Sequence, residues 1–164
     1  MSMTVVIENA TPADLDEVLA LNESEVPHLG SVNIEQMTWF LDHAHYFRVA
    51  RTDDQLAGFL IGLRPGTNYK SLNYLWFCEH YDEFAYVDRI AVTVPARGLR
   101  VGSLLYRDFA DSLPESVKVM TCEVNILPPN EGSMRFHSRL GFREVDTLST
   151  ENGEKKVALL LKDL

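Results

Sequence analysis

The chain has 164 residues, enough for one domain with a substantial core and too few for two of ordinary size. Its composition, 46% hydrophobic and 24% charged, is typical of a soluble globular protein, and no apolar run reaches membrane-spanning length. The net charge of −9 argues against a nucleic-acid-binding surface and mildly favours a cationic or amine substrate. Cys78 and Cys122 lack metal-ligand spacing, so we expect reduced thiols, no metal site and a cytoplasmic protein. We predict a single domain over residues 1–164.

The first third of the chain is predicted to hold a short strand, two helices and a hairpin. The strand begins at residues 5–7, and Thr11 with Pro12 then forms a helix start, as N-cap and first helical residue. Apolar residues at helical spacing give each helix a buried side: Leu15, Val18, Leu19 and Leu21 in the first, and Ile34, Met37, Phe40 and Leu41 in the second. Residues 46–51 and 56–63 then read as a hairpin that turns at Asp53 and Asp54.

Residues 65–84 form an insert that is longer than a hairpin connection needs. The insert is rich in aromatic residues, which argues against disorder: Tyr69, Tyr74, Trp76, Phe77, Tyr81 and Phe84. One interpretation is a local core or a dimer contact. The other is a wall of an acceptor pocket, where aromatic faces hold an amine and nearby acids attract it.

The most informative stretch runs from residue 86 to residue 111. Residues 86–92 read as a strand that ends before Pro95, and residues 103–111 carry a helical apolar stripe of Leu104, Leu105, Phe109 and Ala110. Between them lie Gly98 and Gly102, interleaved with Arg97 and Arg100. A helix start presents unpaired N–H groups, glycine permits close approach, and arginine offers donors that fit phosphate oxygens. The stretch therefore predicts a strand–turn–helix cradle for an anion.

The remaining chain completes a mixed sheet. Residues 117–124 read as a buried strand parallel to the strand at residue 86. Asn130 is a good N-cap for a helix over residues 131–140, with Gly141 just past its end. Residues 143–149 and 155–161 form a hairpin around residues 151–154. The predicted fold class is mixed α/β with the order β-α-α-β-β-β-α-β-α-β-β, the insert lying between central strands.

Two motifs resemble those of the GCN5-related N-acetyltransferase (GNAT) family. The first is the approach from Val92 to Pro95 followed by Arg97 and Gly102, although Arg100 stands where the family has its first motif glycine. The second is Asn130 opening a helix that ends in Gly141-Phe142, with Ser133 and Phe136 at the family's small and aromatic positions. A nucleoside-triphosphate loop would instead need a lysine before Ser103, and a dinucleotide fingerprint would need three glycines.

The resemblance implies a GNAT fold, acetyl-CoA as cosubstrate without a metal, and a set of cofactor-binding residues. The pantetheine arm would lie along Ile90, Ala91 and Val92, where one strand N–H would polarise the thioester carbonyl. The pyrophosphate would lie on the backbone of Arg97 to Ser103. The cofactor-binding candidates are Ile90, Ala91, Val92, Arg97, Gly98, Leu99, Arg100, Val101, Gly102, Ser103 and Asn130. The two helices in the first third of the chain and their connecting loop would cover the acceptor end.

The resemblance makes His137 a catalytic candidate, and strand alternation makes Asp88 one. The structural alternatives are a helix-end histidine and an aspartate paired with a neighbouring arginine. His137 stands where the family usually has the tyrosine that protonates the departing thiolate, and an imidazole can donate a proton near its reference pKa of ~6.5. Asp88 is the candidate for receiving the amine proton, on the same strand face as Tyr86 and Ile90. Glu123 and Glu79 are alternative bases, and an amine of low pKa would need none.

We therefore expect an N-acetyltransferase that moves an acetyl group to a primary amine, either a small molecule or a peptide amino terminus, by direct attack in a ternary complex. The alternative is a non-catalytic acyl-CoA-binding or sensor domain, because His137 and Arg100 depart from the family pattern. A longer acyl donor and a homodimer through the last strands or the insert are further alternatives. No nucleic-acid or membrane partner is expected.

Overall fold

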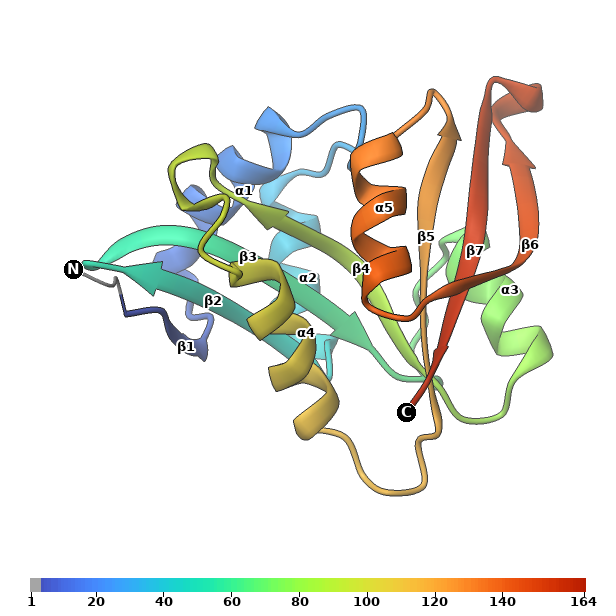
Figure 1. Ribbon diagram of the computed structural model, residues 1–164, viewed down its shortest axis with the longest axis horizontal. Coiled ribbons are helices and arrows are strands. Elements are labelled where there is room, and N and C mark those ends of the chain that lie inside the picture. The colour runs from blue at the N-terminus through green and yellow to red at the C-terminus, as the bar shows by residue number, and fades with distance from the viewer. Residues whose placement is uncertain (1–3) are drawn as a thin grey trace. The chain divides into compact units, whose positions relative to one another are not determined.

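The computed structural model describes residues 4–164, and its elements follow the predicted order with one addition. They are β1 (Val6–Asn9), η1 (Pro12–Asp14), α1 (Leu15–Ser24), α2 (Ile34–His43), β2 (Tyr46–Thr52), β3 (Gln55–Leu63), α3 (Leu72–His80), β4 (Ala85–Val92), η2 (Val94–Ala96), α4 (Val101–Asp111), β5 (Val119–Leu127), α5 (Glu131–Arg139), β6 (Arg143–Thr150), η3 (Glu151–Gly153) and β7 (Lys155–Asp163). In this part of the chain the seven strands form one mixed sheet in the order β1-β2-β3-β4-β5-β7-β6 (Figure 1). The predicted mixed α/β class is confirmed.

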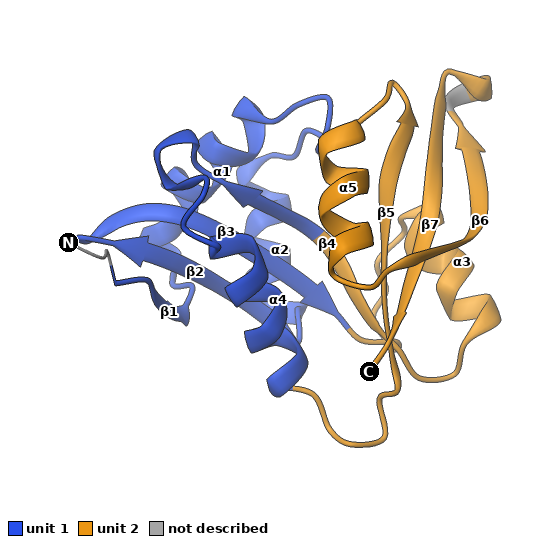
Figure 2. Ribbon diagram, viewed as in Figure 1, with its two compact units in different colours: residues 1–63, 89–112 blue, residues 64–88, 113–164 orange. Residues whose placement is uncertain are grey.

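Close contacts divide the chain into two compact units (Figure 2). Unit 1 comprises residues 1–63 and 89–112, and unit 2 comprises residues 64–88 and 113–164. The division falls within β4, whose first residues belong to unit 2 and whose last belong to unit 1. The single domain over residues 1–164 stays a prediction.

In unit 1, helices cover both faces of the hairpin formed by β2 and β3. The antiparallel pairing of these strands and the left-handed backbone of Asp53 and Asp54 confirm the predicted turn. Helices α1 and α2 lie on one face and α4 lies on the other (Figure 1). Helix α4 packs very closely, because a Cβ added at Gly62 of β3 would lie 2.3 Å from the nearest atom of the Phe109 ring. This close packing therefore requires glycine at position 62.

The Gly62→Ala variant should unfold more easily than the wild type. The added methyl group must displace the buried Phe109 ring, and overpacking of this kind costs about 1–3 kcal/mol. Urea unfolding measures the loss. Gly132→Ala is the matched control, because the nearest side-chain atom to a Cβ there is 4.0 Å away. Equal stability of the two variants would contradict the close packing of α4 on β3.

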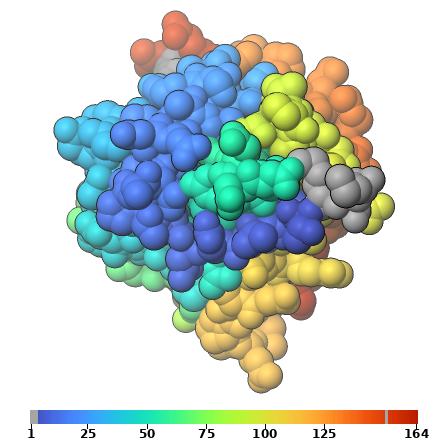
Figure 3. Space-filling model, turned by 90° about the vertical axis from the view of Figure 1, so that its left-hand side faces the viewer, coloured from blue at the N-terminus to red at the C-terminus, as the bar shows by residue number. Residues whose placement is uncertain are grey.

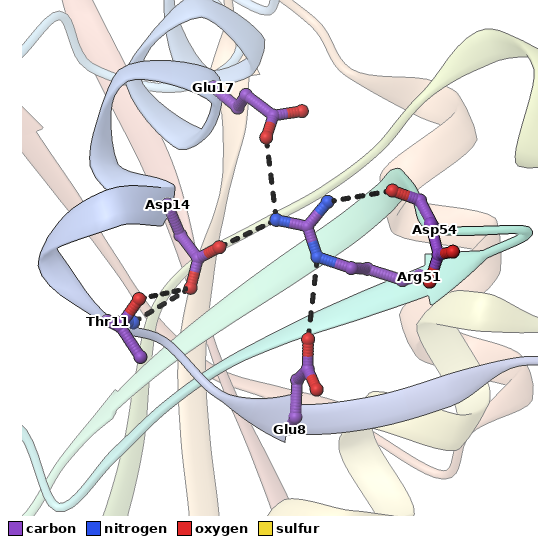
Figure 4. Close-up of polar contacts among 6 residues, drawn as sticks. All are labelled: Glu8, Thr11, Asp14, Glu17, Arg51 and Asp54. Atoms are coloured by element: carbon purple, nitrogen blue, oxygen red, sulfur yellow. Dashed lines mark hydrogen bonds and ion pairs between the residues drawn. The ribbon is translucent and has the colours of Figure 1, made fainter.

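At the edge of unit 1, one arginine holds several elements together (Figure 4). Arg51 on β2 contacts Asp14 at 2.6 Å and both Glu8 and Glu17 at 3.5 Å, and it also donates to the carbonyl of Asp54 at 3.3 Å. Partial burial alone would raise the pKa of Asp14, but hydrogen bonds from Thr11 and Arg51 lower it. Figure 3 shows this face, where β1, the start of α1 and the β2–β3 turn lie side by side. The arginine thus joins β1, η1 and α1 to the hairpin.

In unit 2, helices α3 and α5 lie on opposite faces of the strands (Figure 1). Strand β5 is parallel to β4 at Ala85↔Met120 and Tyr86↔Thr121, and antiparallel to β7, as predicted. Strands β6 and β7 form the predicted final hairpin, and Asn152 and Gly153 take positive φ at its turn. Cys122 on β5 is buried, as expected of a small core residue.

The aromatic insert contains a helix that the sequence analysis did not predict. Ser71 caps α3 by accepting a hydrogen bond from the backbone N–H of Tyr74. Tyr74, Phe77 and Phe84 are fully buried, and the rings of Tyr74 and Phe77 lie 5.5 and 5.9 Å from that of Tyr86. The interpretation of the insert as a local core is therefore confirmed. Its role as an acceptor-pocket wall stays a prediction.

Three predicted stripes need correction. Helix α4 begins at Val101 rather than at residue 103, and it buries Val101, Leu105, Tyr106 and Phe109 while Leu104 is exposed. Ile34, at the start of α2, is also exposed. Helix α1 buries Asn22 rather than Leu19. The physical reason in each case is that the neighbouring strands and helices, and not apolar spacing alone, decide which side of a helix is covered.

Candidate active site

The loop that enters α4, residues 93–100, has an unusual backbone. Gly98 has a φ of +91° and Arg100 has a φ of +61°, so two left-handed residues precede the helix. Arg100 occupies the N-cap position. The first helical hydrogen bond runs from the N–H of Leu104 to the carbonyl of Arg100, at 3.0 Å. A helix start leaves its first N–H groups without carbonyl partners, so those of Val101, Gly102 and Ser103 point out of this end.

The left-handed backbone at residue 100 suits the glycine that the family pattern has there. Gly98 adopts positive φ without steric cost, whereas a residue with a Cβ at Arg100 is strained there. The N–H groups of Arg97 and Leu99 donate to nearby backbone carbonyls, so the donors expected for an anion are the first N–H groups of α4. The anion cradle stays a prediction, and Arg100 is exposed at the start of this helix.

Close packing of β3 fixes where this loop begins. A Cβ at Gly58 would lie 2.7 Å from the carbonyl oxygen of Ala91 and 3.2 Å from a methyl carbon of Val101. The N–H of Thr93 donates to the carbonyl of Ala57 at 2.8 Å. Strand β3 thus contacts both the end of β4 and the start of α4. Ile90, Ala91 and Val92 form that end of β4.

Arg97 has a partner within unit 1. Its Nη2 donates to Oε1 of Glu25, just beyond α1, at 2.9 Å, while the arginine side chain remains 56% exposed. An exposed pair of this kind contributes little to stability, so the guanidinium is free to turn toward an anion at small cost. The contact also places the start of the α1–α2 connection beside the loop.

In unit 2, a buried tyrosine orients a carboxylate. The hydroxyl of Tyr86 on β4 donates to Oε2 of Glu123 on β5 at 2.6 Å. Burial raises the pKa of Tyr86 well above its usual value, and the charges of Glu123 and Asp88 raise it further. Tyr86 therefore stays a neutral donor. Asp88 lies two residues along the strand, and its charge acts on the Tyr86 hydroxyl as that of Glu123 does. Glu79 is exposed on α3.

His137 lies on α5 and is 5% exposed. Its Nδ1 lies 2.8 Å from the backbone oxygen of Ser133, which can only accept, so Nδ1 carries the proton and Nε2 carries the lone pair. Burial lowers the pKa of His137, and the bond to Ser133 offsets this only in part. The imidazole is therefore mainly neutral at pH 7, which changes the expectation that a protonated fraction is present before the reaction.

The helix that carries His137 begins and ends as predicted. Asn130 accepts a hydrogen bond from the N–H of Ser133 at 3.3 Å, and Gly141 follows the helix with a φ of +99°. The N–H of Phe142 donates to the carbonyl of His137 at 3.0 Å, and its ring lies 5.4 Å from the imidazole. Residues at both ends of α5 thus fix the position of His137.

The predicted site residues fall into two groups. Ile90 to Ser103 belong to unit 1, where the end of β4, the loop and the start of α4 are consecutive. Asp88, Asn130 and His137 belong to unit 2, together with Glu123. The sequence analysis missed the contact of Tyr86 with Glu123, and Tyr86 itself was not proposed. The predicted parallel pairing put the two residues on strands of one sheet, but the register that brings them together comes only from the structure.

Within residues 4–164, no group of three or more His, Cys, Asp or Glu side chains is arranged to hold a metal ion. Among the same residues, no helix has the length and apolar character needed to cross a membrane.

Comparisons with known proteins give a match to a family profile and matches to solved structures. The family profile described as Acetyltransferase (GNAT) family matches residues 15–142. A comparison of the sequence with curated proteins finds no significant match. The fold is similar to that of Ard1 from Thermoplasma volcanium, with a TM-score of 0.78 and 16% identity over 98% of this chain and 97% of the other.

Two more solved structures share the fold. The ribosomal-protein-S18-alanine N-acetyltransferase from Escherichia coli has a TM-score of 0.72 and 15% identity over 98% of this chain and 94% of the other. Arabidopsis thaliana Naa50, solved in complex with the bisubstrate analogue CoA-Ac-MVNAL, has a TM-score of 0.72 and 16% identity over the whole of both chains. At these identities, the likeness establishes the fold alone.

Proposed function

Because this chain belongs to the GNAT acetyltransferase family, we propose that it transfers the acetyl group of acetyl-CoA to a primary amine. The observation that supports the proposal is the start of α4, where the left-handed residues Gly98 and Arg100 precede the first N–H groups of the helix, which suit a pyrophosphate. The acceptor is either a small molecule or a peptide amino terminus. We also propose that the protein is cytoplasmic.

The donor would be held by the backbone of two adjacent segments of unit 1. Residues 97–103 would bind the pyrophosphate through N–H groups and the guanidinium of Arg100. Ile90, Ala91 and Val92 would lie along the pantetheine arm, and one N–H of this strand would donate to the thioester carbonyl. An N–H at such a position stabilises the charge that develops on the carbonyl oxygen during attack.

The reaction requires an ammonium group to lose two protons and a departing sulfur to gain one. In R–NH3+ plus acetyl-CoA, the C–N bond forms and the C–S bond breaks, giving the amide, the CoA thiol and one proton. We assign the first proton to the carboxylate of Glu123, which Tyr86 orients, with Asp88 as the second carboxylate that attracts the ammonium group. Asp88 remains the alternative base.

His137 would carry the second proton. Its Nε2 lone pair accepts this proton as the C–N bond forms, and the resulting imidazolium returns it to the sulfur as the C–S bond breaks. Neutral His137 suits the first half of this step, and the bond from Nδ1–H to Ser133 keeps Nε2 as the accepting nitrogen. His137 would therefore become protonated during the reaction and would not act as a preformed acid.

The direct test of the cradle is a thermal-shift titration with acetyl-CoA and with free CoA. At about 100 times its Kd, a ligand that binds only the folded state adds about 2.7 kcal/mol of stability. The Arg100→Ala variant keeps a Cβ in the strained backbone but removes the guanidinium, so it should bind roughly tenfold more weakly with little change in unliganded stability.

The control for this titration is Arg143→Ala, which removes an exposed arginine paired with Asp163 in unit 2 and should bind both ligands normally. A wild type that shows no shift with either ligand would overturn the proposal. Thiol release with a panel of amines then separates a transferase from the non-catalytic acyl-CoA-binding alternative, which would bind without releasing CoA.

A further inference from the structure

A buried arginine joins β4 to the connection between α1 and α2. Arg89 is 8% exposed and its Nη1 donates to Oδ1 of Asn22 at 2.9 Å and to the carbonyl of Gly30 at 3.1 Å. Its guanidinium also lies 5.3 Å from the centre of the Phe40 ring on α2. We call residues 25–33, which connect the two helices, the α1–α2 loop.

Polar groups of α1 hold the same loop. Asn22, completely buried, donates through Nδ2 to the carbonyl of Gly30 at 3.1 Å and to the carboxylate of Glu23 at 2.9 Å. Glu23 in turn accepts from the hydroxyl of Ser31 and from the N–H of Val32. Hydrogen bonds from Ser31 and then Asn22 hold the pKa of Glu23 below its usual range. Consecutive backbone and side-chain groups of the loop are therefore fixed.

The position of the α1–α2 loop relates it to the proposed donor site. Glu25, at its start, pairs with Arg97 of the loop before α4. Arg89 itself directly precedes Ile90, the first residue of the strand proposed to hold the pantetheine arm. The α1–α2 loop thus borders both segments that would bind acetyl-CoA, on the side of β4 that faces α2.

We propose that Arg89 is a positioning residue for the amine acceptor, because it fixes the α1–α2 loop beside the segments that would hold the acetyl donor. This inference rests on the proposed function. Arg89 donates one charge-assisted hydrogen bond to Gly30 of the loop and one to Asn22 of α1, which itself donates to Gly30. Without these bonds a segment that has no regular structure would sample several conformations. Loss of these bonds should weaken acceptor binding and leave donor binding unchanged.

The test compares Arg89→Met, Arg89→Lys and Arg51→Met in steady-state acetyl transfer. Arg89→Met should raise the acceptor KM roughly tenfold and change the acetyl-CoA KM less than about twofold, since the donor contacts lie elsewhere. Arg89→Lys should recover part of the loss, because the ammonium group keeps the positive charge and N–H donors but lacks the planar fork of the guanidinium. Arg51→Met removes another largely buried arginine of unit 1, so it should lower stability without raising the acceptor KM.

A second readout does not depend on activity. In the full-length Arg89→Met protein, backbone amides of residues 25–33 should exchange with solvent faster than in the wild type, while those of α4 should not. If Arg89→Met does not fold, Glu23→Gln provides the test, because Glu23 is an exposed member of the same hydrogen-bond network. Its effects on the acceptor KM and on amide exchange of residues 25–33 should be smaller and in the same direction.

The outcomes separate the two levels of the proposal. A wild type that releases no thiol with any amine contradicts the proposed function itself. An active wild type whose Arg89 and Glu23 variants keep the wild-type acceptor KM and the wild-type exchange of residues 25–33 overturns the role of Arg89. Equal changes in both KM values of Arg89→Met would also overturn it, because they indicate general destabilisation.

Discussion

Replacing Glu123 with glutamine should lower kcat/KM for acetyl transfer by roughly 10²–10⁴-fold, the usual contribution of a positioned proton acceptor. Glutamine keeps the shape of the side chain and can still accept the hydrogen bond from Tyr86, so the fold should be retained. What it loses is the ability to take a proton from the amine. Steady-state thiol release at pH 7.5 measures the effect.

Two further variants assign the role to Glu123. Tyr86→Phe removes only the hydroxyl that orients the carboxylate, so it should cost roughly tenfold in kcat/KM. Glu79→Gln changes the exposed carboxylate of α3 and should leave kcat/KM unchanged. If Asp88→Asn abolishes activity while Glu123→Gln retains it, Asp88 is the base and Glu123 serves only to attract the amine.

Removal of the imidazole in His137→Phe should lower kcat by roughly 10²-fold, because the proton then has no relay to the departing sulfur. Phenylalanine fills the buried site between Phe136 and Phe142, so stability at neutral pH should change little. His80→Phe is the matched control in the same unit, because His80 is exposed on α3 and stacks on Trp76.

The pH profile distinguishes the two roles of His137. Burial lowers its pKa below the ordinary 6.5, so the neutral form predominates above that value. If neutral His137 accepts the proton, kcat falls as the pH drops through the lowered pKa. If protonated His137 is required as a preformed acid, kcat rises over the same range, and the relay is wrong.

Stability should follow the same titration. Because the folded protein binds this proton less readily than the unfolded chain, the unfolded chain is favoured as the pH falls below 6.5. The contribution of His137 to stability is therefore fully present above pH 6.5 and is lost as the pH falls through the folded pKa. In His137→Phe this part of the pH dependence should disappear, which unfolding measurements at several pH values can show.

Residues with a strong local preference made much of the fold predictable. Asn130 is a helix N-cap wherever its side chain can reach the third N–H, and Gly141 tolerates the positive φ that ends a helix. Asn152 with Gly153 likewise specifies a hairpin turn from its own backbone preferences. Such signals act over a few residues, so the chain carries them without reference to the rest of the structure.

The insert shows where local signals are weaker. Ser71 is a sound N-cap and Tyr74 and Phe77 have helical spacing, but aromatic residues favour strands as readily as helices. The helix is decided by the burial of these rings against Tyr86, which lies outside the insert on β4. The family resemblance gave no help here, because the helix lies in an insert.

The sequence by itself determined the family and the order of the elements other than α3, because glycines, caps and strand ends report on neighbouring residues. Only the tertiary structure decided how individual side chains act. The partner of Tyr86 is 37 residues away and that of Arg89 is 67 residues away, so no local pattern specifies them. Burial likewise set the protonation of His137, because desolvation depends on everything that packs around the ring.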